Sequence, residues 1–353
     1  MTKPAALLLL AATLLFGPLT AHGAALEEVA AASADAYAGI FQKFSHYETV
    51  VAPDKDAPEW WAGAPSVVHD PDTGFWMACR MRIGEGPRGL RGYEVRILRS
   101  DDGIHFTPVL NIRREDVPIP GFERPALVRD PKTGKFRLYG CGPWKDGPWS
   151  IIKWDDADRP DQIVVTSAKP VIVPPEKEHE RDIVPKGFKD PVILFAEGVW
   201  HCYVIGYIRE NERIFHFSSP DGLPRLAVGD FRTPVMDLTG WHDFFVRPAS
   251  VVPVGAGYLF VYEGSKTSWH DPVYNVATGL GFTFDLHRIM DLTPDTPLAL
   301  STTPSADFAT LRYSHWLDRG DELWVYAEAA RPNESHEIRL FRPGRSRQGP
   351  RQP

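Results

Sequence analysis

The sequence predicts an all-β protein, a five-bladed β-propeller of four-stranded antiparallel blades preceded by a short N-terminal helix. A unit made of a proline, an apolar strand, a turn and a second strand centred on an aromatic residue recurs five times. The units open at residues 65, 125, 191, 248 and 313, so they lie 57 to 66 residues apart. This period holds four strands and their loops, which is the content of one propeller blade. Few other stretches show helical periodicity.

The first two units match each other most closely. Residues 65–78 read PSVVHDPDTGFWMA, and residues 125–138 read PALVRDPKTGKFRL. Third strands are expected at 93–99, 150–154, 213–217, 274–284 and 337–341. Asp-Gly turns at residues 100–103 and 219–222, where glycine supplies the positive φ of a tight hairpin, follow two of the expected third strands. Two stacked antiparallel sheets with similar turns remain an alternative interpretation.

The ends of the chain predict an exported protein. Residues 1–23, with Lys3 before an apolar run and small residues after it, are typical of a secretory signal peptide. We expect a helix or linker at 24–54, the propeller at 55–342 and a disordered tail at 343–353. No later segment approaches the roughly 20 apolar residues of a membrane helix. The expected location is therefore secreted or periplasmic, without a membrane span.

The composition argues against several classes of partner. The formal net charge is -7 with no basic block, so nucleic acid is not expected as a partner. The three cysteines Cys79, Cys141 and Cys202 cannot all pair within one chain, and their spacing matches no zinc motif. A single disulfide stays open. We expect a monomer without a cofactor, and leave open a structural calcium ion in the channel.

Polar residues at the blade openings are expected to converge on one mouth of the central channel, because the first strand of each blade lines the axis. This ring contains Glu59, Trp61, Glu123, Arg124, Lys189, Asp190, Arg247 and Arg312. A second ring, at the ends of the second strands, contains Arg80, Glu263 and Glu328.

A carboxylate that ends a hydrophobic strand needs a partner or a solvent-filled cavity. Arg247 and Arg312 are the expected counter-charges of Glu263 and Glu328. The alternative is that such pairs are structural and join the blades. His242 and His315 also lie near the mouth, where each can be a binding group or a hydrogen-bonded structural histidine.

Carboxylates that face each other across a pocket are what cleavage of a glycosidic bond requires: one protonated donor and one ionised base or nucleophile. Glu123 beside Arg124 and Asp190 beside Lys189 are the leading pair, with Asp190 as general acid, and Glu263 is the reserve candidate. Tryptophans in loops near the openings offer flat faces for a sugar ring. These are Trp60, Trp61, Trp144, Trp241 and Trp269.

The blade openings resemble the inner strands of the five-bladed propeller glycosidases and phosphorylases, the superfamily of glycoside hydrolase families 43, 32, 68, 117 and 130. The resemblance rests on residues 123–136 and 190–194, and residues 262–282 are similar to the family 130 pattern. It implies a carbohydrate substrate and catalytic carboxylates in the axial pocket. Compared with family 43 enzymes, Ala64 and Arg124 stand where aspartates are expected, and Asp190 stands where a glutamate is expected.

Three functions follow from these observations. The first is an exported glycoside hydrolase that acts on an oligosaccharide or polysaccharide. The second is a phosphorylase or an anionic-sugar enzyme, in which Arg124, Lys189, Arg247 and Arg312 bind phosphate or a uronate. The third is a non-catalytic carbohydrate-binding propeller.

Overall fold

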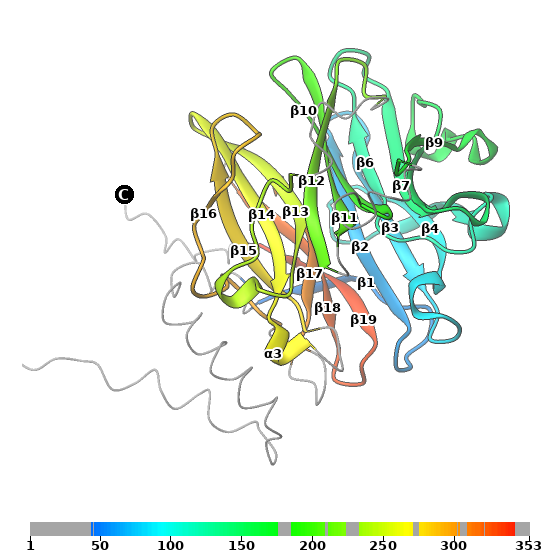
Figure 1. Cartoon of the computed structure of the whole chain (residues 1–353). Coiled ribbons are helices and arrows are strands. Elements are labelled where there is room, and N and C mark those ends of the chain that lie inside the picture. Colours follow the sequence, from blue (N-terminus) through cyan, green and yellow to red (C-terminus); the bar gives the residue numbers. More distant parts are fainter. Residues whose placement is uncertain are drawn as a thin grey trace, which may run out of the picture.

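The chain folds into five small antiparallel blades arranged around one axis, as a computed structural model shows (Figure 1). The structure describes residues 44, 46–175, 185–208, 211–223, 233–270, 275–301, 303, 309–320 and 322–342. The predicted signal peptide, most of the predicted N-terminal helix and the predicted tail lie outside these residues.

Within blades 1 to 4 the strands follow each other in chain order, and blades 5 and 1 are joined into one eight-stranded sheet. Blade 1 contains β2 (Trp61–Asp70), β3 (Gly74–Arg82), β4 (Gly92–Ser100) and β5 (Thr107–Arg113). Blade 2 contains β6 (Ala126–Arg129), β7 (Phe136–Pro143), β8 (Trp149–Lys153) and β9 (Lys169–Ile172). Blade 3 contains, among the described residues, β10 (Phe188–Ala196), β11 (Val199–Ile208) and β12 (Asn211–Ser219).

The remaining two blades complete the circle. Blade 4 contains β13 (Phe245–Val254), β14 (Gly257–Ser265), β15 (Ala277–Thr283) and β16 (Met290–Asp291), with a short helix α3 (Thr267–His270) after β14. Blade 5 contains β17 (Leu311–Asp318), β18 (Leu323–Ala330), β19 (His336–Phe341) and β1 (Glu48–Val51). The five predicted inner strands and the five predicted third strands are all present.

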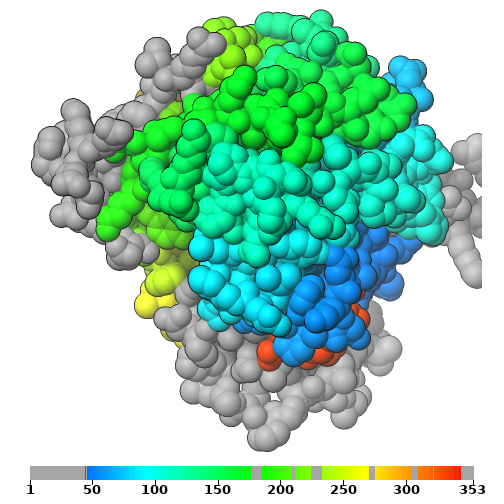
Figure 2. Space-filling model, turned by 90° about the vertical axis from the view of Figure 1, so that its right-hand side faces the viewer, coloured from blue at the N-terminus to red at the C-terminus, as the bar shows by residue number. Residues whose placement is uncertain are grey.

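The inner strands β2, β6, β10, β13 and β17 contact one another in a closed ring, each touching the next and β17 touching β2. A single parallel bridge between His336 and Trp61 also links blade 5 to blade 1. Figure 2 shows blades 1 and 2 side by side, in blue to cyan and in teal to green. The propeller prediction is therefore confirmed, and the alternative of two stacked sheets is wrong.

The first described strand closes the circle. β1 pairs antiparallel with β19 and supplies the outer strand of blade 5, although it precedes blade 1 in the chain. The ion pair between Arg342 and Glu48 ties the two ends of this blade together. β1 lies within the segment 24–54, where a helix or linker was expected, so part of that segment belongs to the propeller sheet.

Four of the five inner strands share an irregularity at the end that lies at the mouth of the channel. The pairing register shifts between Gly63 and Ser66 in β2, and at the matching points of β10, β13 and β17. The bulged residues Ala64, Asp190 and Tyr313 have φ of 53°, 56° and 52°. Bulges of this kind re-aim side chains and are frequent beside functional sites. The mouth of the channel is thus built from strained, repeat-equivalent positions.

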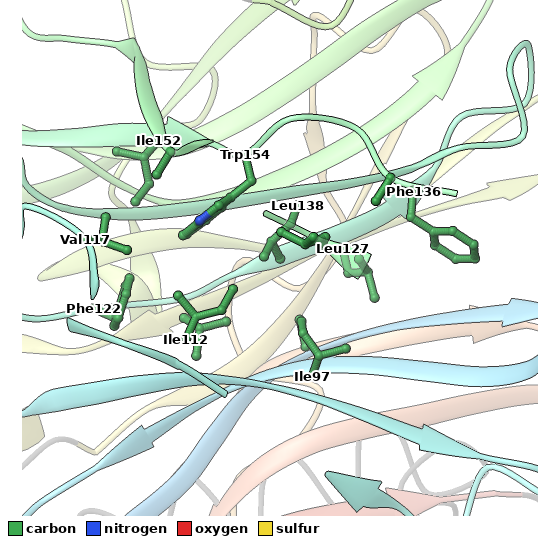
Figure 3. Close-up of a cluster of buried hydrophobic side chains, with 14 of the residues drawn as sticks. Ile97, Ile112, Val117, Phe122, Leu127, Phe136, Leu138, Ile152 and Trp154 are labelled. Carbon is green, nitrogen blue, oxygen red and sulfur yellow. The ribbon is translucent and has the colours of Figure 1, made fainter. Parts of the chain in front are cut away.

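Apolar side chains fill the space between neighbouring blades. Figure 3 shows the cluster between blades 1 and 2, where Ile97 and Ile112 face Leu127, Leu138 and Trp154, all of which are buried. Such contacts make each blade depend on its neighbours, because one sheet alone cannot cover both of its faces.

All three cysteines are buried and free, so the open question of a single disulfide is answered in the negative. No helix of the described residues is long and apolar enough to cross a membrane.

Candidate active site

A pocket of about 290 Å³ lies at one end of the axis, where the inner strands enter the channel. Every blade contributes to it, and its lining is mostly cationic and aromatic. The lining residues are Arg80, Arg82, Arg88, Gly89, Glu123, Trp149, Lys189, Tyr207, Arg247, Arg312 and Tyr313. Five of the predicted site residues therefore meet in one pocket: Arg80, Glu123, Lys189, Arg247 and Arg312.

Glu123 is the one carboxylate among the described residues that line this pocket. It precedes β6 and forms an ion pair with Arg80 of β3. The side chain of Glu123 is 12% exposed, whereas that of Arg80 is 1% exposed. The ion pair favours the ionised form of a carboxyl group that can still meet a ligand.

Two clusters of buried ion pairs lie behind the residues that line the pocket. Glu212 is the centre of the first. Its carboxylate accepts hydrogen bonds from Lys189 Nζ at 2.7 Å and from the Tyr207 hydroxyl at 2.5 Å, and pairs with Arg247. Burial raises the pKa of Glu212, but Arg247 and Lys189 lower it more, so the pKa lies well below its ordinary value. Glu212 is thus a fixed negative charge that positions two cations of the pocket. The sequence led us to expect that Arg247 pairs with Glu263. In the structure Arg247 pairs with Glu212 instead.

Glu328 forms the second cluster. Arg312 donates to its Oε1 from Nε and Nη2 at 2.9 and 2.7 Å, and His336 Nδ1 lies 2.6 Å from the same oxygen. Arg80 Nη2 lies 3.3 Å from Oε2. Arg312 is the counter-charge predicted for Glu328. Burial opposes ionisation of Glu328, but Arg312 and its other partners hold its pKa well below the ordinary value.

The position facing Glu328 has to be glycine. A Cβ at Gly63 would lie 1.7 Å from Glu328 Oε2. The neighbouring backbone N–H of Ala64 donates to that oxygen over 3.1 Å. The bulge of β2, with no side chain on one residue and a methyl group on the next, therefore leaves room for the carboxylate of blade 5.

Glu59 and Trp61 support the pocket from behind. Glu59 has a φ of 62° and pairs with Arg91, and its oxygens lie 3.8 Å from Arg82 Nη2 and 3.6 Å from Arg88 Nη2. The Trp61 ring is buried beneath the Arg82 guanidinium, whose carbon lies 3.6 Å from the ring centroid. Neither predicted residue lines the pocket; both position arginines that do.

Asp190 is buried behind Tyr313. The Tyr313 hydroxyl donates to Asp190 Oδ2 over 3.1 Å, and the backbone N–H of Arg124 donates to Oδ1 over 3.1 Å. The side chain of Asp190 therefore does not line the pocket, and Tyr313 stands between them. The pairing register also places Tyr313 level with Asp190, and Arg312 level with Lys189, so the alignment of the fifth blade by sequence was one residue out.

Arg124 and Glu263 lie in the interior of the channel. Arg124 donates to the carbonyl oxygens of Pro248 and Ala249 over 3.0 and 2.6 Å, and so links blade 2 to blade 4 across the axis. Glu263 accepts a hydrogen bond from the backbone N–H of Ser314. Burial raises the pKa of Glu263 to about 7, although Arg124 and other arginines oppose this shift.

The two predicted histidines are outside the pocket. His242 is fully buried in blade 4, where its Nε2 lies 2.9 Å from Asp291 Oδ2. His315 lies on β17 beyond the bulge, and burial, with the charge of Arg124, lowers its pKa to about 3. Both histidines therefore fit the alternative given above, that of a structural histidine and not a ligand-binding group.

Sequence reasoning missed six residues of this region: Arg82, Arg88, Trp149, Tyr207, Glu212 and Tyr313. Tyr207 and Glu212 flank the hairpin between the second and third strands of blade 3, and Arg82 ends the second strand of blade 1. The repeat could have found Tyr313 if the fifth blade had been aligned through its bulge. Nothing in the linear sequence pairs Glu212 with Lys189 and Arg247.

Among the described residues, no three His, Cys, Asp or Glu side chains lie close enough together to hold a metal ion. A calcium ion in the channel therefore gains no support from this part of the chain.

No protein-family model and no curated protein matches the chain. Solved structures of similar fold include a thermostable family-43 glycoside hydrolase, with 14% identity and a TM-score of 0.59 over 86% of this chain and 97% of that one. They also include a β-1,2-mannobiose phosphorylase from Listeria innocua, with 14% identity and a TM-score of 0.58 over 82% and 94% of the two chains. A third is an α-L-arabinofuranosidase from Podospora anserina, with 11% identity and a TM-score of 0.58 over 85% and 98%. The chain therefore has the fold that these propeller glycosidases and phosphorylases share.

Proposed function

We propose that the protein is an enzyme that cleaves a glycosidic bond of an oligosaccharide in the axial pocket. The observation that carries this proposal is Glu123, a partly exposed carboxylate, paired with Arg80, in the axial pocket of a propeller fold. The similar structures include glycoside hydrolases and a phosphorylase that was solved with a bound mannobiose. Fold likeness alone does not fix a reaction, so the assignment depends on this site.

In the proposed reaction Glu123 is the ionised partner, as the sequence suggested. A carboxylate in this role either attacks the anomeric carbon or removes a proton from the attacking water. Arg80 forms an ion pair with Glu123, and the aromatic rings of Trp149 and Tyr313 provide flat surfaces for the sugar.

The proton donor is assigned to one of two buried carboxyl groups. Asp190, the donor suggested by the sequence, can exchange a proton with the pocket only through the Tyr313 hydroxyl that it binds. Glu263 has a pKa of about 7, the range suited to a general acid, and sits against Ser314, next to Tyr313. The Asp190 route would make Tyr313 part of the proton path.

Phosphorolysis is the second candidate, because the cationic lining also suits an inorganic phosphate. In that reaction phosphate replaces water as the attacking group, and turnover depends on added phosphate. Export, which the N-terminal sequence predicts, favours hydrolysis, since phosphate is better controlled inside the cell.

The test is a screen of oligosaccharides and aryl glycosides for released reducing ends, with and without phosphate. We expect hydrolysis without phosphate and a loss of at least about a hundredfold in kcat for Glu123→Gln. Glu115→Gln, which removes a carboxylate with a 65% exposed side chain outside the pocket lining, is the control and should leave kcat unchanged. Binding of a glycan with measurable affinity and no turnover would instead identify a non-catalytic carbohydrate-binding propeller.

The cellular location is tested separately. We propose that residues 1–23 direct export and are removed, so mass spectrometry of the protein from culture medium or periplasm should find an N-terminus near residue 24. Recovery of the full-length chain in the cytoplasm would contradict this.

A further inference from the structure

The carboxylate of Glu123 is held by a single ion pair. Within the described part of the chain, Arg80 of β3 is the only cation with which Glu123 pairs. The backbone of Glu123 is fixed separately, because its N–H donates to the carbonyl oxygen of Cys141 over 3.2 Å. The direction in which the Glu123 carboxylate points therefore depends on where the guanidinium of Arg80 lies.

Arg80 is held in turn by a second carboxylate. Its Nη1 pairs with Glu123, and its Nη2 lies 3.3 Å from Glu328 Oε2. Among the described residues, these two are the only carboxylates with which Arg80 forms ion pairs. Because a guanidinium group is planar and rigid, a contact at one Nη atom restricts the direction of the other. Arg80 thus connects Glu328 of blade 5 with Glu123 of blade 2.

Glu328 is fixed firmly and cannot meet a ligand itself, since its side chain is 0% exposed. Its Oε1 accepts two hydrogen bonds from Arg312 and lies 2.6 Å from His336 Nδ1. Its Oε2 accepts a hydrogen bond from the backbone N–H of Ala64. Both oxygens are therefore bound to groups of β17, β19 and β2, which makes the carboxylate a rigid support for Arg80.

Gly63 provides the room for this support. It lies level with Arg80 in the pairing of β2 and β3. The three atoms nearest to a Cβ at Gly63 all belong to the Glu328 side chain, and Oε2 would be only 1.7 Å away. A methyl group at this position would therefore displace the Glu328 carboxylate and leave every charge in place.

We infer that Glu328 is a positioning residue for Glu123 and acts through Arg80. This inference rests on the proposed function, because Glu328 has no access to the substrate and affects the reaction only through Glu123. When the Glu328 carboxylate is removed or displaced, Nη2 of Arg80 loses its partner, and Arg80 no longer holds Glu123 toward the sugar. A displacement of about 1 Å can slow a reaction by about a hundredfold.

The experiment compares wild type, Glu328→Gln and Gly63→Ala on a glycan that the screen described above shows to be cleaved. Both substitutions should lower kcat by roughly tenfold to a hundredfold and change KM by less than about threefold. Gly63→Ala keeps all charges, so it also carries the test if Glu328→Gln does not fold. Urea denaturation gives the folded fraction of each variant, so that kcat is expressed per folded molecule.

Glu337→Gln is the matched control. Glu337 is a buried carboxylate of the same blade, and it pairs with Arg339 at 2.8 Å and Arg331 at 3.5 Å. None of these three residues lines the pocket. The substitution should therefore lower stability but leave kcat per folded molecule unchanged.

A double-mutant cycle separates positioning from a general loss of structure. If Glu328 acts through Arg80, then Glu328→Gln, or Gly63→Ala in its place, should lower kcat by less than about twofold in an Arg80→Gln background. A merely structural role would give the same fold-change in kcat with and without Arg80.

Two results would overturn the inference and leave the proposed function intact. The first is an unchanged kcat for Glu328→Gln and Gly63→Ala while Glu123→Gln abolishes cleavage. The second is a loss of kcat that is equally large in the Arg80→Gln background. Cleavage that does not depend on Glu123, or no cleavage of any glycan by wild type, would instead remove the proposed function, and this inference with it.

Discussion

Tyr313 donates its hydroxyl hydrogen to Asp190 over 3.1 Å, and the two residues come from different blades. Both residues have positive φ, and they occupy matching bulge positions of β10 and β17. The Tyr313 ring lies between two arginines, with the guanidinium carbons of Arg80 and Arg312 at 5.3 and 4.9 Å from its centroid. One hydrogen bond therefore joins the wall of the pocket to the buried interior of the channel.

Tyr313→Phe keeps the ring and removes this hydrogen bond. Because the bond reaches a buried carboxylate, its loss should lower the free energy of unfolding by about 1.5–3 kcal/mol, measured by urea denaturation. If the proton path includes Tyr313, kcat should also fall with little change in KM. Tyr93→Phe is the control, since Tyr93 binds Asp54 at an exposed site and should cost less than about 1 kcal/mol. Equal effects of the two substitutions would contradict the argument.

Glu328 should be essential to the stability of blade 5. Glu328→Gln removes the negative charge that Arg312 and Arg80 share in the interior, and leaves buried cations without full compensation. Such a change costs about 3–5 kcal/mol. Glu322→Gln, at an exposed site where the side-chain oxygen accepts from Trp324, is the matched control and should change the unfolding free energy by less than about 0.5 kcal/mol.

The three thiols should be inert in the folded protein. Burial raises the pKa of Cys79 to about 12 and also raises the pKa values of Cys141 and Cys202. A thiolate is the reactive form, so a thiol reagent at pH 8 should label no cysteine in the native state and three after denaturation. Denaturation with and without a reducing agent should give the same midpoint. A single labelled thiol after denaturation would indicate a disulfide between the other two cysteines.

The blade repeat made the fold predictable, because each unit carries its own strand and turn signals. Residues 65–78 and 125–138 form the same hairpin in the structure as in the prediction. The bulge was harder to place: in blade 5 it falls at Tyr313, where no proline marks it. Periodicity locates a strand, but it does not locate a single extra residue within it.

Sequence reasoning could find a pair of site residues only where both lie on neighbouring strands of the same blade. Arg312 and Glu328 face each other on neighbouring strands of one blade, so counting along the strands found them. Glu212 was missed because its partners Lys189 and Arg247 come from different strands and, in part, from another blade. An ion pair between Arg247 and Glu263 was expected within blade 4, but Arg247 pairs instead with Glu212 of blade 3.

Glu263 gives the clearest prediction for the dependence of stability on pH. Its pKa is about 7 in the folded protein and about 4.3 in an unfolded chain. Between these values the folded state binds the extra proton, so the contribution of Glu263 to stability is complete below about pH 4.3 and is lost as the pH rises through about 7.

Glu263→Gln removes this group while its side-chain oxygen can still accept from Ser314. Wild-type protein should lose up to about 3 kcal/mol of unfolding free energy between pH 5 and pH 8 that the variant does not lose. Buried histidines such as His315, whose pKa is lowered to about 3, also make stability depend on pH, but they contribute equally to wild type and variant and cancel in the difference between them. Urea denaturation at several pH values measures the difference. Parallel curves for wild type and Glu263→Gln would show that Glu263 is ionised throughout, and would leave Asp190, acting through Tyr313, as the proton donor.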